Sequence, residues 1–175
     1  MEKYLVTGAV VWAVLAAAWD VWKGRIPNYL TYSGILLGLL ARLLLSGWRE
    51  ALDGLAACLL GGGIFLLFFL VRGMGAGDVK LMAAIGAFAG LRQTVVILLT
   101  TAIAGGLLAI GYMIFYRRGL RTLQNLAALF RFHMIFGWQA HPEINLENPT
   151  AVRMPYALAI AAGTIYSFST VLLRG

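Results

Sequence analysis

The residues best suited to chemistry in this sequence are two aspartates, Asp20 and Asp78, which stand beside long apolar segments. Asp78 lies in a glycine-rich break between two apolar runs, residues 73–80, which read GMGAGDVK. An ionisable residue flanked by membrane-spanning sequence is costly to place, which indicates a functional site with a partner elsewhere in the chain. Two carboxylates held together at low dielectric cannot both ionise easily, so one keeps a proton while the other activates a water. This is the chemistry with which aspartic proteases attack a peptide carbonyl.

Simpler interpretations of the same residues stay open at this point. Asp20 also fits an interfacial residue beside Lys23 and Arg25, and the glycines also fit a flexible hinge between helices. Intramembrane carboxylates mark ion pathways as well, so a small membrane transporter or channel is the alternative function, and a non-catalytic assembly scaffold is a third. A phosphate-binding loop is not indicated, because a Walker loop continues from Gly-Lys into Ser or Thr.

The composition is that of an integral membrane protein. Of the 175 residues, 61% are hydrophobic and only 12% are charged, against about 25% charged in soluble domains. The formal net charge of +7 comes from basic residues scattered between apolar segments, so nucleic acid is not an expected partner. A single cysteine, Cys58, rules out an intrachain disulfide framework and a cysteine-based zinc cluster. The expected surrounding is a lipid bilayer.

Six apolar segments must position the two aspartates, and they predict an all-α polytopic membrane protein with six transmembrane helices. The segments are residues 4–19, 29–46, 51–71, 79–91, 94–116 and 154–173, with short breaks expected at 20–28, 47–50 and 92–93. The second segment carries Gly34 and Gly38 four residues apart, a spacing that allows close helix approach. The fourth segment, at about 1.5 Å per residue, covers only roughly 20 Å, too little to cross a bilayer alone. Either the bilayer thins locally, or this helix begins inside the membrane after the glycine-rich break, with Asp78 in a wet pocket; we expect the second arrangement.

The distribution of basic residues predicts the orientation in the membrane. With the N-terminus and the C-terminus both outside, nine of the fourteen basic residues fall inside. The five that fall outside are Lys3, Arg42, Arg49, Arg92 and Arg174. This topology places Asp20, at the inner end of the first span, and Asp78, at the inner start of the fourth, near the same membrane face. The inner segment 117–153 begins with an amphipathic pattern that predicts an interfacial helix between the fifth and sixth spans.

The residues around both aspartates resemble a known family. Asp20 is followed by RIPN at 25–28, and GAGDVKL at 75–81 opens the fourth span. Both stretches are similar to the type IV prepilin peptidases and the related preflagellin peptidases, which are GxGD membrane aspartic proteases. MPYALAIAAG at 154–163 resembles their last span, in particular that of the short enzymes of Flp (Tad) pilus systems. The resemblance implies that Asp20 and Asp78 are the catalytic pair.

The resemblance also implies a substrate and a location. The substrate is the basic cytoplasmic leader of a pilin-like precursor, cut before its hydrophobic helix for pilus biogenesis or secretion. The enzyme is expected in the inner (cytoplasmic) membrane, with its active site facing the cytoplasm and without a cofactor. Larger bifunctional members carry a cytoplasmic domain with paired CxxC motifs after the first span and methylate the new terminus. Here the first two spans nearly adjoin and Cys58 is alone, so we expect one membrane-embedded peptidase domain, residues 1–175, without a separate methyltransferase domain.

Six residues near the aspartates are candidates for substrate binding or site shaping: Arg25, Pro27, Asn28, Gly75, Gly77 and Lys80. The two glycines would let the backbone pass close to the substrate, since no side chain blocks the approach. Lys80 fits either a residue that orients the leader or lipid headgroups, or an ordinary snorkelling lysine. Pro27 and Asn28 are expected to start the second helix. A metal site is not expected, because no His-Glu-x-x-His motif is present.

Overall fold

The computed structural model of this chain describes residues 2–115, 124, 125, 128, 129, 131, 132, 134, 135, 137, 139 and 154–173. Six helices of at least 14 residues occupy this described part, which contains no strand. They are α1 (Glu2–Lys23), α2 (Asn28–Ser46), α3 (Trp48–Leu70), α4 (Ala76–Ala89), α5 (Leu91–Phe115) and α7 (Ala157–Leu173). The predicted all-α class is confirmed, while the predicted interfacial helix within 117–153 lies largely outside the described residues.

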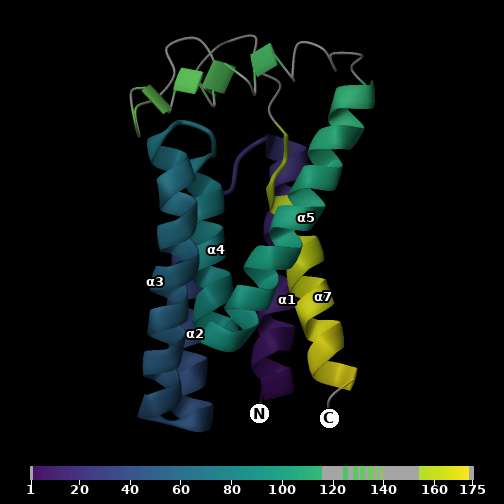
Figure 1. Cartoon of the computed structure of the whole chain (residues 1–175). Helices are drawn as coiled ribbons and strands as arrows, with labels where there is room; N and C mark the ends of the chain where they lie inside the picture. Colours follow the sequence, from purple (N-terminus) through teal and green to yellow (C-terminus); the bar gives the residue numbers. More distant parts are fainter. Residues whose placement is uncertain are drawn as a thin grey trace.

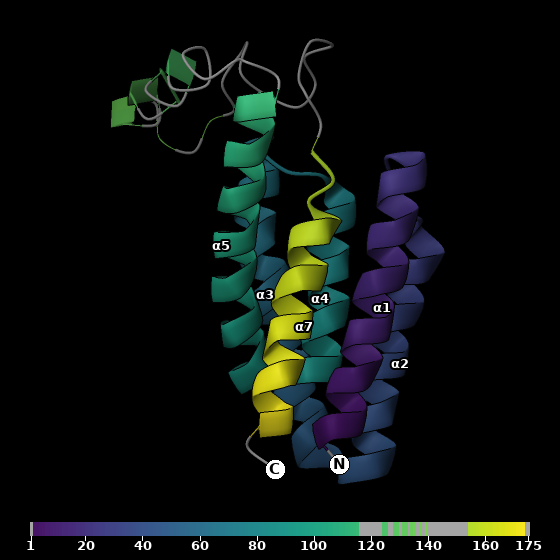
Figure 2. The same ribbon diagram turned by 90° about the vertical axis from the view of Figure 1, so that its right-hand side faces the viewer.

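The six helices run alternately up and down in one bundle, so the two termini lie at the same end (Figures 1 and 2). Four helices, α1, α2, α3 and α5, are long and apolar enough to cross a membrane. The apolar helix α7 has 17 residues, and α4 has 14. The chain is therefore an all-helical membrane protein in which four of the described helices reach the length of a span by themselves.

The shortest of these helices, α4, is the one that the others surround. It contacts all five of the other helices, and eight of its 14 residues are buried. Leu81, Met82 and Ile85 are completely covered and belong to a core that also contains Ile97 and Ile160 from α5 and α7. Burial on every side is typical of a core helix. The position of α4 is therefore determined by its neighbours, although the helix is too short to cross a bilayer alone.

Two glycines of α2 allow the close helix approach that their spacing predicts, and the helix that they meet is α4. A Cβ on Gly34 would lie 3.0 Å from the Cβ of Ala84, and one on Gly38 would lie 2.9 Å from the backbone nitrogen of Phe88. Both distances are shorter than ordinary van der Waals contact, so the helices approach this closely only because these positions lack a side chain. The prediction of close helix approach is confirmed.

The breaks between helices are shorter than the sequence predicts. Helix α1 continues to Lys23, α3 already begins at Trp48 and α5 begins at Leu91, so the breaks expected across 20–28, 47–50 and 92–93 were too long or misplaced. Two of the breaks fall on glycines: Gly47 has φ 90° and Gly90 has φ 79°, values that residues with a side chain rarely adopt. The polar residues beside these breaks stay helical, because water can hydrogen-bond to the free backbone groups of the first and last helical turns.

A buried arginine joins α2, α3 and α4 at the end of the bundle that carries the termini. Arg42 is only 4% exposed, and its guanidinium lies 2.6 Å from a carboxylate oxygen of Glu50 and 2.6 Å from one of Asp53. It also donates to the backbone carbonyl of Phe88, near the end of α4. The Asp53 carboxylate in turn accepts the backbone N–H of Leu91, at the start of α5. Arg42 is thus an internal link of the bundle and not a loop residue.

Candidate active site

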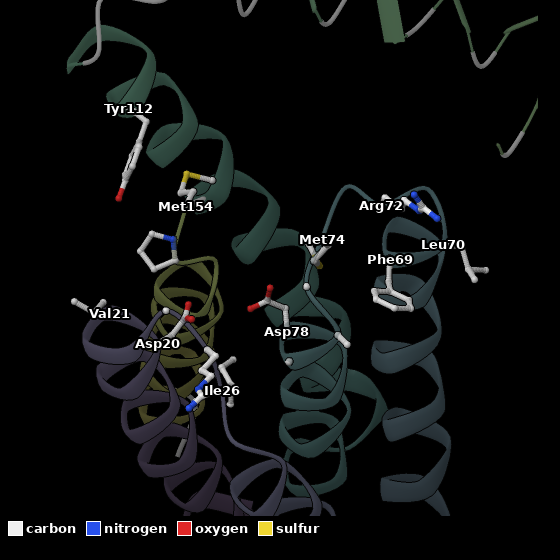
Figure 3. A pocket seen from close by; sticks show the side chains of 16 residues that line it. Asp20, Val21, Ile26, Phe69, Leu70, Arg72, Met74, Asp78, Tyr112 and Met154 are labelled. Atoms are coloured by element: carbon white, nitrogen blue, oxygen red, sulfur yellow. The ribbon is translucent and has the colours of Figure 1, made fainter. Parts of the chain in front are cut away.

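A pocket of about 860 Å³ lies at the end of the bundle opposite the two termini. Its walls come from the C-terminal parts of α1, α3 and α5, the start of α4, the residues before α2 and α4, and the two residues 154 and 155 ahead of α7. Asp20 and Asp78 both line it, and their carboxylates point toward one another across the pocket (Figure 3). The structure thus brings together the two aspartates that the sequence places at one membrane face.

Asp78 is held by the start of its own helix. It is the third residue of α4, and Gly75 precedes the helix as its N-cap. The backbone N–H of Gly75 donates a hydrogen bond to the Asp78 carboxylate, which corresponds to one half of a capping box. A Cβ on Gly75 would lie 3.2 Å from Oδ2 of Asp78, so the missing side chain leaves room for the carboxylate to fold back. The other oxygen, Oδ1, is buried and has no hydrogen-bond partner among the described residues.

Asp20 is held by a helix that lies far along the sequence. The backbone N–H of Ala157, the first residue of α7, donates a hydrogen bond to the Asp20 carboxylate. Helix N-termini present free N–H groups and the positive end of the helix dipole, both of which suit a carboxylate. Both aspartates are therefore positioned by backbone donors at helix starts.

Burial and mutual repulsion act on the charges in the pocket. Asp78 lies outside the four helices that are long enough to span a membrane. Burial raises the pKa of its carboxyl to about 7, and the negative charge of Asp20 acts in the same direction. Burial also raises the pKa of Tyr156, just ahead of α7, and the charge of Asp78 adds to that shift. Near neutral pH, Asp78 therefore exchanges a proton readily, as acid–base work by a carboxylate pair requires.

Three of the six neighbouring candidates, Arg25, Gly75 and Gly77, line the pocket. The two glycines have neighbours within the protein itself. The missing side chain of Gly75 makes room for the Asp78 carboxylate, while a Cβ on Gly77 would lie 3.2 Å from the Cβ of Ile26. The two glycines therefore allow close packing within the site wall, and the expected approach of the substrate backbone to them stays a prediction.

The other three candidates lie outside the pocket lining. Pro27 is the N-cap of α2 and Asn28 is its first residue, which confirms the predicted helix start. The Lys80 ammonium donates to Oδ1 of Asn28 over 2.9 Å and lies 4.8 Å from the centre of the Tyr32 ring. Lys80 is thus engaged with α2 and does not reach into the pocket.

Several pocket residues could not be found from the sequence. Phe69, Leu70 and Tyr112 line the pocket, but they sit in apolar spans and look no different from lipid-facing neighbours. Met154 and Pro155 also line it, and here a signal existed, since both belong to the motif at 154–163. The motif indicated a family-like last span without showing that its first residues form a wall of the site.

The site combines features that suit hydrolysis of a peptide. Two carboxylates from separate helices share a pocket whose volume lies within the usual range for ligand sites. Among the described residues, no group of three or more His, Cys, Asp and Glu side chains could hold a metal ion. Fold and site together define the class: an all-helical membrane protein with a paired-carboxylate pocket at one end of its bundle.

Comparison with known families then identifies the chain. A model described as the type IV leader peptidase family matches residues 8–110, which is more than half of the 175 residues. The chain belongs to this family and is therefore a membrane-embedded peptidase. The matched region includes both Asp20 and Asp78 and ends before α7. Comparison with curated proteins gave no match, and neither did comparison with solved structures.

Proposed function

We propose that this chain is an aspartic endopeptidase that removes the basic cytoplasmic leader from pilin-like precursors, with Asp20 and Asp78 as its catalytic pair. The observation that carries the proposal is the meeting of two carboxylates from separate helices in one pocket (Figure 3). Membership of the type IV leader peptidase family supports the substrate class. The product would serve pilus biogenesis or secretion.

In this mechanism Asp78 holds the shared proton and Asp20 acts as the base. The pKa of about 7 for Asp78 and its buried, unpartnered Oδ1 support this division of roles. Asp20 takes a proton from a water molecule, the water oxygen attacks the peptide carbonyl carbon, and Asp78 gives its proton to the carbonyl oxygen. When the tetrahedral intermediate collapses, the C–N bond breaks and the proton on Asp20 passes to the leaving amine. The reforming carboxyl group returns a proton to Asp78.

The backbone donors keep the two carboxylates in place during these steps. The N–H of Ala157 holds Asp20 and the N–H of Gly75 holds Asp78. Neither backbone donor is ionisable, so neither one takes up or releases a proton during these steps. Donors that are fixed before the reaction need no reorganisation at the moment of bond breaking, which favours the transition state.

We further propose that the six described helices lie in the inner membrane as one peptidase domain. Both termini lie outside and the pocket faces the cytoplasm. The up-and-down order of the helices supports an even number of crossings (Figure 1), and the excess of basic residues predicted for the pocket side supports its cytoplasmic placement. The pocket then meets the leader where it leaves the bilayer.

Leader removal by the purified protein tests the catalytic pair. The protein is reconstituted in lipid and incubated with a pilin precursor, and the size shift is followed by electrophoresis. Asp20→Asn and Asp78→Asn keep the side-chain shape, and each is expected to lower the rate at least about a hundredfold. Glu50→Gln, which changes a half-exposed carboxylate at the opposite end of the bundle, is the matched control and is expected to cleave normally.

Two outcomes would contradict the proposal. Cleavage at the normal rate by either aspartate variant would remove that residue from the catalytic pair. Proton or cation flux into liposomes, without cleavage of any precursor by the unmodified protein, would favour an ion pathway through the same carboxylates.

A further inference from the structure

The connection between α1 and α2 is tied to the start of α4 by a polar contact outside the pocket lining. We propose that Lys80 and Asn28 form a clamp that fixes this connection against α4 and thereby sets the separation of Asp20 and Asp78. The inference rests on the proposed function and deepens it, because it concerns how the same pocket is held in shape. Lys80 and Asn28 act here as positioning residues and touch no reacting atom.

The clamp contacts α2 and the residues before it on both sides of the α2 N-cap. After the N-cap, the Lys80 ammonium donates to Oδ1 of Asn28 over 2.9 Å. The same ammonium lies 4.8 Å from the centre of the Tyr32 ring, one turn further along α2. Before the N-cap, Ile26 packs against Gly77, where a Cβ would lie 3.2 Å from the Ile26 Cβ. The first turns of α4 therefore contact this part of the chain at three places: Ile26, Asn28 and Tyr32.

Both aspartates lie close to this clamp along the chain. Asp78 is two residues before Lys80 in α4, so it moves with the lysine. Asp20 lies near the end of α1, and only residues 24–27 connect that helix to Asn28. Since consecutive Cα atoms are about 3.8 Å apart, so short a link leaves little freedom once Asn28 is held.

The connection is itself part of the site. Gly24, Arg25 and Ile26 all line the pocket, and Figure 3 shows Ile26 beside the space between the two aspartates. The N–H of Gly24 donates to the backbone carbonyl of Asp20 over 2.7 Å, so the connection begins directly at the aspartate. If Asn28 moves away from Lys80, this wall and the end of α1 move with it, and the two carboxylates lose their common geometry.

The rate of disulfide formation between positions 26 and 77 tests the clamp independently of catalysis. Ile26→Cys and Gly77→Cys are introduced together with Cys58→Ala, which removes the single natural cysteine. The Cβ separation at this pair is close to the distance that a disulfide requires, so the pair is expected to oxidise readily in this parent chain. Adding Asn28→Leu or Lys80→Met is expected to slow the oxidation several-fold, because the wall is no longer held against α4.

A matched control removes a different lysine at the same end of the bundle. Lys23 is exposed, and its ammonium rests 4.1 Å from the centre of the Trp22 ring. Lys23→Met deletes the same charge as Lys80→Met without touching the clamp. It is expected to leave the oxidation of the cysteine pair unchanged.

The kinetics of leader removal measure the effect of the clamp on the reaction. In the chain with its natural cysteine, Asn28→Leu and Lys80→Met are each expected to lower kcat about tenfold or more with little change in KM, since misplacement by about 1 Å can cost a hundredfold in rate. The double variant is expected to be no slower than the slower single variant, because both changes break one contact. Lys80→Arg keeps a donor at this position and is expected to restore most of the rate.

The two measurements separate the clamp from the proposed function. Unchanged oxidation in Asn28→Leu and Lys80→Met would overturn the clamp, whether or not the chain cleaves a precursor. Slower oxidation with an unchanged kcat would overturn its role in positioning Asp20 and Asp78. If the unmodified protein cleaves no precursor, the proposed function fails, and the oxidation rates alone then support or overturn the clamp.

Discussion

Replacing Gly75 with alanine places one methyl group against the carboxylate of Asp78. The new Cβ would lie 3.2 Å from Oδ2, a few tenths of an ångström inside ordinary contact. The backbone at Gly75 is extended, with φ −78° and ψ 146°, and alanine adopts this conformation freely. The substitution therefore acts on the carboxylate and leaves the backbone unstrained.

The size of the effect follows from the hydrogen bond that the carboxylate would give up. Asp78 avoids the methyl group by turning away from the backbone N–H of Gly75, its donor in this structure. In the proposed mechanism Asp78 becomes charged as it gives its proton to the carbonyl oxygen, and a hydrogen bond to a charged group contributes about 1.5–3 kcal/mol. Each ~1.4 kcal/mol of lost transition-state stabilisation lowers a rate tenfold. We expect kcat for leader removal to fall by about tenfold to a hundredfold, with KM nearly unchanged.

Steady-state cleavage of a pilin precursor by the reconstituted protein separates kcat from KM. Gly63→Ala in α3 is the matched control, because a Cβ there would meet nothing within 4 Å, and it should keep both constants. The control should not lower the free energy of unfolding, since alanine in a helix interior is more favourable than glycine by about 0.5–1 kcal/mol. An unchanged kcat in Gly75→Ala would refute the reasoning. A raised KM with a normal kcat would instead assign Gly75 to the wall that contacts the substrate.

Four further predictions concern pH and the scaffold. Cleavage should fall as the pH rises through about 7, because Asp78 then loses the shared proton; a rate that keeps rising well into alkaline pH would contradict this. The folded-state pKa of Asp78 lies above its ordinary value of 3.8. The free energy of unfolding should therefore fall, relative to that of Asp78→Asn, as the pH rises from about 4 to about 7, which unfolding in detergent measures. Gly38→Ala should lower the free energy of unfolding by about 1–3 kcal/mol, because its Cβ would lie 2.9 Å from the backbone nitrogen of Phe88; equal thermal unfolding temperatures would refute the close contact. Arg42→Met should destabilise the protein by about 3 kcal/mol, the low end for a buried ion pair because both acidic partners are partly exposed, and denaturant unfolding of the two proteins measures the difference.

Much of the scaffold could be predicted because it depends on local properties of the sequence. The length of each apolar run predicted the helices and the short α4. The four-residue spacing of Gly34 and Gly38 predicted close approach, although not that α4 would be the partner. Counting apolar segments placed the end of α1 and the start of α4 at one end of the bundle, and hence Asp20 with Asp78. These inferences need only hydrophobicity, length and chain direction.

Contacts between distant residues could not be predicted, because they depend on which helices meet and at what height. Nothing in the sequence paired Asp20 with the N–H of Ala157, or Lys80 with Asn28. Charge counting treated Arg42 as a basic residue of the outer side, whereas packing buries it among acids and a helix end. For Lys80 and Arg42 the sequence showed a charge but not the neighbour that determines its role.

The hydrogen-bond donor for Asp20 belongs to the last of the six described helices, which has a consequence for synthesis on the ribosome. When α1 to α5 have been made, both aspartates are present, yet the Asp20 carboxylate still lacks the N–H of Ala157. Met154 and Pro155, which close one wall of the pocket, are also still to come. At that stage the nascent chain contains both aspartates but not yet all the residues that line the pocket. Under the proposed mechanism, the pocket therefore reaches the form described here only when α7 docks against α1.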